Sequence, residues 1–271
     1  MFSVQNEILA LSEAELVTRL LPAMQAQHQR ALFERPQLLA GSDFDLPTYI
    51  LSYYTSQEGI AVLPIKGMMS RNYTYFNEQS NSMLMMMLER ASKNDSIKGV
   101  VFDIYSGGGT VDSTKALADA IANFPKPTAT ATAFCCSAAY WAASATNQIF
   151  IEPQSATEVG SIGTIYFRIG QKGAIEAVGN SIDVMRSIGA TKKAMDNPFE
   201  DLTDEVRAVI QGKLDISAKE FQTGVKLGRV GKLSSDEIFT GNTYGVRDAL
   251  RLGLADQKGT LADAINWLKK Q

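Results

Sequence analysis

The sequence predicts an α/β fold whose central sheet is largely parallel. Short apolar runs typical of buried strands alternate along the chain with stretches that repeat apolar residues at helical spacing. The chain of 271 residues is 45% hydrophobic and 20% charged, an ordinary composition for a globular protein. Its formal net charge of -3 is evenly spread and supplies no basic surface, so we expect no nucleic-acid partner.

Residues 1–58 are predicted to form an N-terminal helical extension and linker, followed by the main domain at 59–271. Ser12 and Glu15 have the spacing of a capping box at the start of a leucine-rich helical pattern. The start of the chain lacks a basic and apolar leader. The uncharged stretch 127–151 is rich in Thr, Ser and Ala, which favours a buried strand and helix over a membrane span. We therefore expect no membrane anchor and a cytoplasmic location.

Strands and helices alternate through the main domain. The strands are predicted at 60–65, 99–105, 128–133, 148–151 and 181–187. The helices are predicted at 73–92, 111–124, 137–145, 204–226, 243–252 and 260–269. Thr203 is a suitable N-cap for the longest helix. Pro64 has no amide hydrogen to donate, so we expect the first strand near an edge or an end of the sheet.

A glycine-rich turn, Ser106-Gly107-Gly108-Gly109, follows a predicted buried strand. Its glycines let the backbone approach a ligand closely and turn amides toward an anion. A phosphate-binding loop would need Lys-Ser or Lys-Thr next, and a dinucleotide-binding turn would need glycine in place of Asp112. An oxyanion hole needs only backbone amides. An ordinary connection between a strand and a helix explains the turn equally well.

Ser137 stands where an apolar strand turns into a helix of small residues. The first amides of a helix are free, and the helix dipole there favours negative charge, so an oxyanion would be stabilised. The segment taken alone favours a simpler role for Ser137 as helix cap. Cys135 and Cys136 are adjacent, which suits disulfide geometry poorly, so we expect two free thiols and a reducing compartment.

A serine nucleophile needs a base, and the single histidine, His28, lies in a glutamine-rich segment outside the predicted main domain. Cys136 as nucleophile would face the same shortage. Lysine remains, and it acts as a base only when burial or a nearby positive charge keeps it neutral. Lys192 and Lys193 both qualify, and an exposed basic turn is the ordinary alternative. One histidine and two adjacent cysteines do not make a zinc site, and we expect no metal and no other cofactor.

In combination these segments resemble the signal peptide peptidase A family of Ser–Lys serine peptidases, which has the Clp-protease/crotonase-like fold of repeated ββα units. The resemblance runs from about Gly59 to the C-terminus. It rests on motifs in the family's order, at 60–67, 106–111, 136–140, 160–163, 193–200, 238–241 and 252–256. Two departures stand out: Gly107 replaces the family's proline, and Ala138-Ala139 replaces its Gly-Gly.

The resemblance implies a serine endopeptidase in which Ser137 is the nucleophile and Lys193 the general base. It implies that the amides of Gly108 or Gly109 and of Ala138 form the oxyanion hole. It also implies a ring-like homo-oligomer, in which the lysine can serve the serine of a neighbouring copy. Protein or peptide substrates follow from this chemistry.

Within the family the chain is most similar to the phage head-assembly protein C-type capsid proteases, because of its Cys-Ser-Ala pattern and its Asn197-Pro198-Phe199-Glu200 stretch. This implies cleavage of scaffold or capsid proteins, with scaffold, capsid or portal proteins as partners, in the host cytoplasm or the phage prohead. One alternative is a cytoplasmic signal-peptide-peptidase-like protease that degrades peptides. Another is a non-catalytic or acyl-CoA-binding protein of the crotonase fold.

Overall fold

The computed structural model describes residues 45–74 and 77–271. The predicted capping box and His28 lie outside these residues. The described residues divide into two compact units. The small unit is Ile165–Ile216, and the sheet unit consists of residues 45–164 and Ser217–Gln271.

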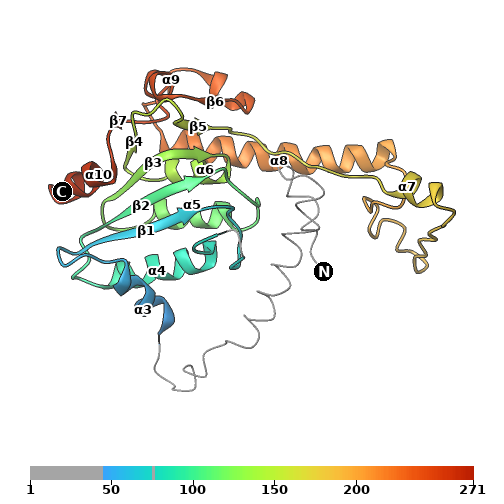
Figure 1. Ribbon diagram of the computed structural model, residues 1–271, viewed down its shortest axis with the longest axis horizontal. Coiled ribbons are helices and arrows are strands. Elements are labelled where there is room, and N and C mark those ends of the chain that lie inside the picture. The colour runs from blue at the N-terminus through green and yellow to red at the C-terminus, as the bar shows by residue number, and fades with distance from the viewer. Residues whose placement is uncertain (1–44, 75–76) are drawn as a thin grey trace. The chain divides into compact units, whose positions relative to one another are not determined.

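A seven-stranded sheet organises the sheet unit (Figure 1). Its strands are β1 Ile60–Lys66, β2 Gly99–Ser106, β3 Thr128–Cys136, β4 Gln148–Ile151, β5 Glu158–Gly160, β6 Thr243–Tyr244 and β7 Gln257–Lys258. The order β1-β2-β3-β4-β7 is parallel throughout. The far end of β3 also pairs in parallel with β5, and β5 pairs antiparallel with β6. The largely parallel sheet is therefore confirmed, and β1, which carries Pro64, lies at its edge as predicted.

Helices cover both faces of the sheet. The α-helices described are α3 Leu46–Tyr53, α4 Asn81–Lys93, α5 Thr114–Ala122, α6 Ala138–Ser144, α7 Lys172–Ala177, α8 Asp204–Gly228, α9 Val246–Arg251 and α10 Leu261–Leu268, of which α7 and the first part of α8 belong to the small unit. On one face, strand residues such as Leu63 and Phe102 share a large apolar core with α4, α5, α6 and the later part of α8. On the other face a smaller core forms between the strands and α10, where Val101 contacts the group that includes Leu268. Side chains alternate between faces along a strand, so an uninterrupted apolar strand such as β2 fits a sheet that is covered on both sides.

Three predicted elements differ from the structure. The helix predicted at 73–92 begins at Asn81, because the Ser80 hydroxyl accepts from the Met83 amide (3.2 Å) and sets the N-terminus there. The helix predicted at 111–124 begins at Thr114, because Ser113 has φ 68, which no helix allows. The helix predicted at 243–252 is a short strand followed by α9.

The strand predicted at 181–187 was wrong. The segment forms no strand, and Ile182 and Met185 are 45% and 92% exposed. A strand needs a neighbour to receive its backbone hydrogen bonds, and within the described residues none of the strands pairs with this segment. The short strands β5, β6 and β7 were not predicted, since two or three residues are too few to show alternation.

Candidate active site

Ser137 lies between the end of β3 and the start of α6, in a backbone conformation that is rare for serine. Its φ is 53° and its ψ is -125°. Conformations of this kind cost about 1–3 kcal/mol and persist where the surrounding structure enforces them, often at active sites. Here the Ser137 amide donates to the carbonyl of Gly160 (2.8 Å), which fixes the turn from the β5 side. A sharp strand-to-helix turn that carries a serine is the geometry of a nucleophile elbow.

The hydroxyl of Ser137 is not used to cap the helix. The side chain makes no capping hydrogen bond, so the simpler interpretation of this residue as a helix cap is wrong. The residue is partly exposed, and no group in the described part of the chain accepts from or donates to its Oγ atom. Ala138 is the first residue of α6, and an amide at that position has no acceptor within its own helix. Ser137 therefore presents a free hydroxyl next to a free amide.

The glycine turn packs directly on Ser137. Gly108 has φ 105°, and a Cβ atom placed on it would lie 2.7 Å from the Ser137 Cβ and 3.0 Å from the Ala138 nitrogen. Only glycine fits such a contact with backbone in that conformation. The fold thus brings together three of the residues predicted from sequence, namely Gly108, Ser137 and Ala138.

Within the turn, the amides of Gly108 and Gly109 differ. The Gly108 amide donates to the Ser106 hydroxyl (3.1 Å), which in turn donates to the carbonyl of Gly67 (2.5 Å). The Gly109 amide has no acceptor among the residues described. Gly109 is held by Met69, whose amide donates to the Gly108 carbonyl (2.8 Å) and whose carbonyl accepts from Thr110 (2.9 Å). Of these two amides, that of Gly109 is the one left without an acceptor in the described part of the chain.

Lys193 belongs to the small unit, where its side chain is exposed. Its carbonyl accepts a hydrogen bond from Arg186 Nε (2.6 Å). Arg186 also binds the Glu200 carboxylate, through Nη1 at 3.0 Å. The hydrogen bond from Arg186, followed by one from Asn197, lowers the pKa of Glu200 to about 2. An ionised Glu200 thus anchors Arg186, and Arg186 holds the backbone at Lys193.

Lys192 has a different environment from Lys193. Its Nζ atom lies 2.9 Å from Glu205 Oε1, in a pair whose side chains are 72% and 64% exposed. The Lys192 ammonium is thus engaged with a carboxylate, whereas no ion pair of the Lys193 ammonium is found among the residues described.

The two cysteines are free, as predicted, and the structure shows that both are buried. Burial, followed by the nearby carboxylate of Glu158, raises the pKa of the Cys136 thiol to about 11. Burial raises the pKa of Cys135 well above its ordinary value. The thiolate is the nucleophilic form of cysteine, so at neutral pH neither thiol is suited to attack a substrate.

Two further features concern cofactors and membranes. In residues 45–74 and 77–271, no group of three or more His, Cys, Asp or Glu side chains is arranged to hold a metal ion. Among the helices described, none is both long enough and apolar enough to cross a bilayer.

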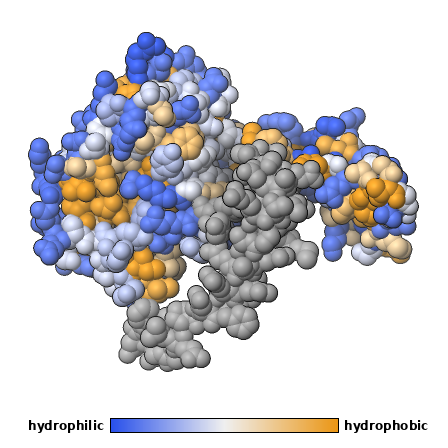
Figure 2. Space-filling view, viewed as in Figure 1, coloured by the Kyte–Doolittle hydropathy of each residue, from blue (hydrophilic) through white to orange (hydrophobic). Residues whose placement is uncertain are grey.

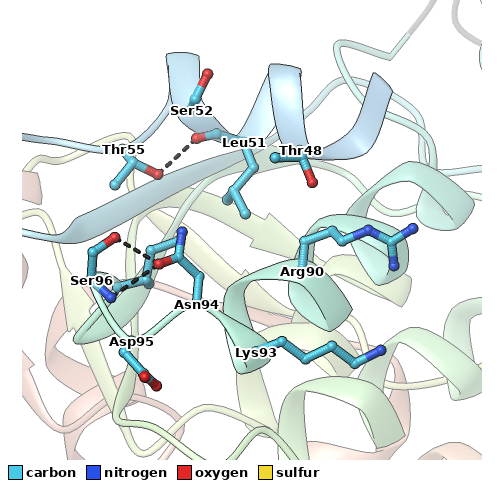
Figure 3. Close-up of a pocket in the computed structure, with 10 residues that line it drawn as sticks. Thr48, Leu51, Ser52, Thr55, Arg90, Lys93, Asn94, Asp95 and Ser96 are labelled. Carbon is cyan, nitrogen blue, oxygen red and sulfur yellow. Dashed lines mark hydrogen bonds between the residues drawn. The ribbon is translucent and has the colours of Figure 1, made fainter. Parts of the chain in front are cut away.

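A separate cavity of about 510 Å³ lies between α3 and the end of α4 (Figure 3). Arg90 lines it but is paired with Asp45 at 2.5 Å, and Lys93 is paired with Glu89 at 2.7 Å. None of the candidate site residues lines this cavity. Its cations are neutralised within the chain, so we assign it no part in the chemistry at Ser137.

Two residues that support the site were not identified from the sequence. Ser106 stood inside the glycine motif, but its hydrogen bonds to Gly108 and Gly67 depend on a strand neighbour that is distant in sequence. Arg186 lay in the segment that was predicted as a strand, and nothing in its spacing pointed to Lys193.

A serine with a free hydroxyl on a strained strand-to-helix turn, beside unpaired backbone amides on an α/β fold, has the arrangement that acyl-transfer enzymes use. A match to peptidase family S49 covers residues 124–271, more than half of the chain. The chain belongs to peptidase family S49.

Individual relatives agree with this assignment. Capsid assembly protease C of Escherichia phage lambda is 29% identical over 85% of this chain and 53% of its own length. Head-tail preconnector protein GP5 of Enterobacteria phage P21 is 27% identical over 90% of this chain and 50% of its own length. An Enterococcus faecium protein named for signal peptide peptidase SppA is 27% identical over 80% of this chain and 64% of its own length. The chain spans about half the length of the two phage relatives.

Solved structures confirm the fold class. An enoyl-CoA hydratase from Shewanella pealeana aligns with a TM-score of 0.50 over 84% of this chain and 79% of the hydratase, at 11% identity. At this identity the likeness concerns the fold alone. The predicted crotonase-like fold and the predicted resemblance to signal peptide peptidases and phage capsid proteases are both confirmed.

Proposed function

We propose that this protein is a serine endopeptidase with Ser137 as nucleophile and Lys193 as general base. The observation that carries the proposal is the strained, uncapped Ser137 in contact with the glycine turn. Membership of peptidase family S49 supports it. The buried, protonated cysteines and the pairing of Lys192 leave Ser137 and Lys193 as the better candidates.

In this mechanism neutral Lys193 accepts the proton of Ser137 Oγ as that oxygen attacks a peptide carbonyl carbon. The amides of Gly109 and Ala138 stabilise the resulting oxyanion. Lys193 then protonates the leaving nitrogen as the C–N bond breaks, which leaves an acyl-enzyme on Ser137. Water, activated by the same lysine, attacks the acyl carbon and releases the acid.

A base lysine must be desolvated, whereas Lys193 is exposed in the single chain. The small unit also exposes many large apolar side chains (Figure 2), among them Met185 at 92% and Ile188 at 107%. Soluble proteins rarely expose such a concentration of apolar residues unless another chain covers it. We therefore propose that the active form is a homo-oligomer, in which a neighbouring copy buries this surface and desolvates Lys193.

The names of the relatives guide the choice of substrate. Two of them are phage proteins of capsid assembly and of the head-tail preconnector, which favours cleavage of phage scaffold or capsid proteins in the host cytoplasm or prohead. The relative named for signal peptide peptidase supports the second candidate, a protease that degrades peptides.

The adjacent lysines Lys192 and Lys193 provide the first test. Lys193→Ala is expected to lower kcat/KM for casein or a capsid-protein peptide by about 10²–10⁴-fold, the usual contribution of a general base. Lys192→Ala, which removes only an exposed ion pair, is the matched control and is expected to stay within about threefold of wild type. Size-exclusion chromatography verifies that both variants keep the wild-type assembly. Full activity in Lys193→Ala would remove this residue from the mechanism.

The hydrogen bond from Arg186 to the Lys193 carbonyl, called the clamp below, provides a second test. Arg186→Leu removes the hydrogen bond to the Lys193 carbonyl and is expected to lower kcat by about 10–100-fold, since a shift of about 1 Å in a catalytic group can cost 10²-fold. Lys172→Ala breaks the exposed Lys172–Asp201 pair in the same unit and is the control. Equal kcat values for Arg186→Leu and the control would show that the clamp has no role in catalysis.

A further inference from the structure

A loop that follows β1 lies between the glycine turn and the start of α4. On the side of the turn, the Met69 amide donates to the Gly108 carbonyl (2.8 Å) and the Met69 carbonyl accepts from the Thr110 amide (2.9 Å). On the side of α4, the Ser70 carbonyl accepts from the amide of Asn81 (2.9 Å), which is the first residue of the helix. The loop therefore connects the glycine turn to α4.

The side chain of Asn81 makes a second connection to the same turn. Its Nδ2 atom donates to the Ser113 hydroxyl (2.9 Å), and that hydroxyl donates to the carbonyl of Asp112. Asn81 is 1% exposed and Ser113 is buried, so water does not compete for these bonds. The two residues are 32 positions apart, and they meet because α4 and α5 pack against each other (Figure 1). A closed ring of contacts thus runs from Asn81 through the loop and the turn and back to Asn81.

Ser113 has to be held in place, because its backbone has a conformation that serine rarely adopts. Its φ is 68°, in the left-handed region. The next residue, Thr114, donates from its hydroxyl to the carbonyl of Thr110 (2.8 Å), the residue that follows Gly109. A change in the backbone at Ser113 is therefore passed through Thr114 to the peptide next to Gly109. The Gly109 amide is one of the two proposed oxyanion donors.

One atom of Asn81 is unfavourable for stability. Its Oδ1 atom is buried and has no hydrogen-bond partner among the residues described. A buried acceptor without a partner destabilises a fold, whereas leucine, which has nearly the same shape as asparagine, would bury no polar atom here. What asparagine offers at this place and leucine does not is the hydrogen bond to Ser113.

We propose that Asn81 is a positioning residue for the oxyanion hole: its side chain holds Ser113 and thereby orients the Gly109 amide toward the substrate carbonyl. The proposal rests on the proposed function, in which the Gly109 amide stabilises the oxyanion formed by attack of Ser137. Asn81 acts through Ser113 and is not itself a catalytic residue. Because the oxyanion exists only during the reaction, loss of this hydrogen bond should lower kcat and leave KM nearly unchanged.

Asn81→Leu keeps the shape of the side chain and removes the donor. Its kcat for casein is expected to fall by about tenfold, since a displacement of about 1 Å in a catalytic group can cost 10²-fold, while KM stays within about threefold of wild type. Its melting temperature is expected to equal or exceed that of wild type, because the unpaired Oδ1 atom is gone. An unchanged kcat would overturn the proposal. So would a lower melting temperature with kcat and KM both changed, the pattern of a purely structural role.

The matched control is an asparagine at the other end of α4. Asn94 is exposed, and its Oδ1 atom accepts from the amide and the hydroxyl of Ser96 (3.0 and 2.7 Å). Asn94→Leu therefore removes a similar side chain from the same helix without touching the turn. It is expected to keep the kcat of wild type.

A second variant tests whether the effect passes through the hydroxyl of Ser113. Ser113→Gly removes this hydroxyl, and glycine adopts the positive φ without strain. Once the acceptor is gone, the donor of Asn81 has no further use at the turn. In the Ser113→Gly background, Asn81→Leu is therefore expected to change kcat by less than about twofold. A full tenfold loss in that background would show that Asn81 acts by another route and would overturn the proposal.

Hydrogen exchange separates failure of this proposal from failure of the proposed function. The amides of Gly108 and Thr110 are hydrogen-bonded, so their exchange reports the order of the turn without any cleavage. In Ser137→Ala, adding Asn81→Leu is expected to speed exchange in the segment that contains them by about 2–10-fold, the size for one hydrogen bond. Faster exchange supports the proposal even if the wild type cleaves nothing, and unchanged exchange overturns it whatever the kcat values.

Discussion

Ser137→Ala is expected to lower kcat for peptide cleavage by a factor on the order of 10⁶, the size found when a serine nucleophile is removed. In the proposed mechanism the free Oγ atom forms the acyl-enzyme, and the adjacent Cys136 thiol cannot replace it, since burial raises the pKa of Cys136 to about 11. The backbone around position 137 is fixed by the Gly160 carbonyl and not by the hydroxyl, so alanine should leave the fold intact. Casein cleavage by the purified assembly measures the loss.

Labelling by a fluorophosphonate, read by intact mass, identifies the reactive serine directly. Ser161 is the matched control because it is partly exposed and has the same φ of 53° as Ser137. Wild type and Ser161→Ala are expected to gain one label, and Ser137→Ala none. Labelling that persists in Ser137→Ala and disappears in Ser161→Ala would show that Ser161 is the nucleophile.

The sequence predicted the fold better than the site, for physical reasons. Long apolar segments such as 99–105 can be recognised as strands from the sequence, because a strand buried on both faces of a sheet needs apolar side chains throughout. The strand predicted at 181–187 failed because its apolar residues are exposed in the single chain and have no paired neighbour there. Hydrophobic periodicity does not distinguish apolar residues that stay exposed from apolar residues that enter the core.

At the site, local sequence favoured the wrong role for Ser137. A serine before a helix is usually a cap, whereas Ser137 has a positive φ, makes no capping hydrogen bond, and contacts Gly108 and Gly160, which are distant in sequence. The choice between Gly108 and Gly109 depended in the same way on the hydrogen bond to Ser106. Lys193 was chosen over Lys192 by family resemblance, and the structure adds only that Lys192 forms an exposed ion pair with Glu205.

The largest effect on stability is expected at a buried ion pair. Arg229 is fully buried, donates to the Gly253 carbonyl (2.9 and 2.7 Å) and binds Asp256 (2.8 and 3.0 Å). Asp256 also accepts from the Ile149 amide (2.7 Å) and pairs with Lys232 (2.7 Å), so it connects the end of α8 to β4. Asp256→Ala would leave the Arg229 guanidinium buried without its counter-ion, which is expected to lower the free energy of unfolding by about 3–5 kcal/mol.

The same carboxylate should make stability depend on pH in acid. Burial alone would raise the pKa of Asp256, but hydrogen bonds from Arg229 and Lys232 outweigh burial and lower it. Because the pKa of Asp256 is lower in the folded state than in the unfolded state, ionisation of this carboxylate stabilises the fold. The contribution is fully present above the pKa of Asp in the unfolded state, about 3.9. That stability is lost as the pH falls through the folded value. Below about pH 4 the wild type should therefore lose stability that Asp256→Ala never had, and the two unfolding free energies should converge.

Urea unfolding followed by circular dichroism at pH 7 and at steps below pH 4 measures both effects. Asp119→Asn is the matched control, because Asp119 forms an exposed pair with Lys115 at 2.6 Å on one helix turn. Such pairs contribute about 0.2–0.5 kcal/mol, so the control should follow the wild type closely at every pH. A difference of less than about 1 kcal/mol between Asp256→Ala and wild type at pH 7 would mean that the Arg229 charge is satisfied without its carboxylate. The Gly253 carbonyl, which already accepts two hydrogen bonds from Arg229, would then be its main partner.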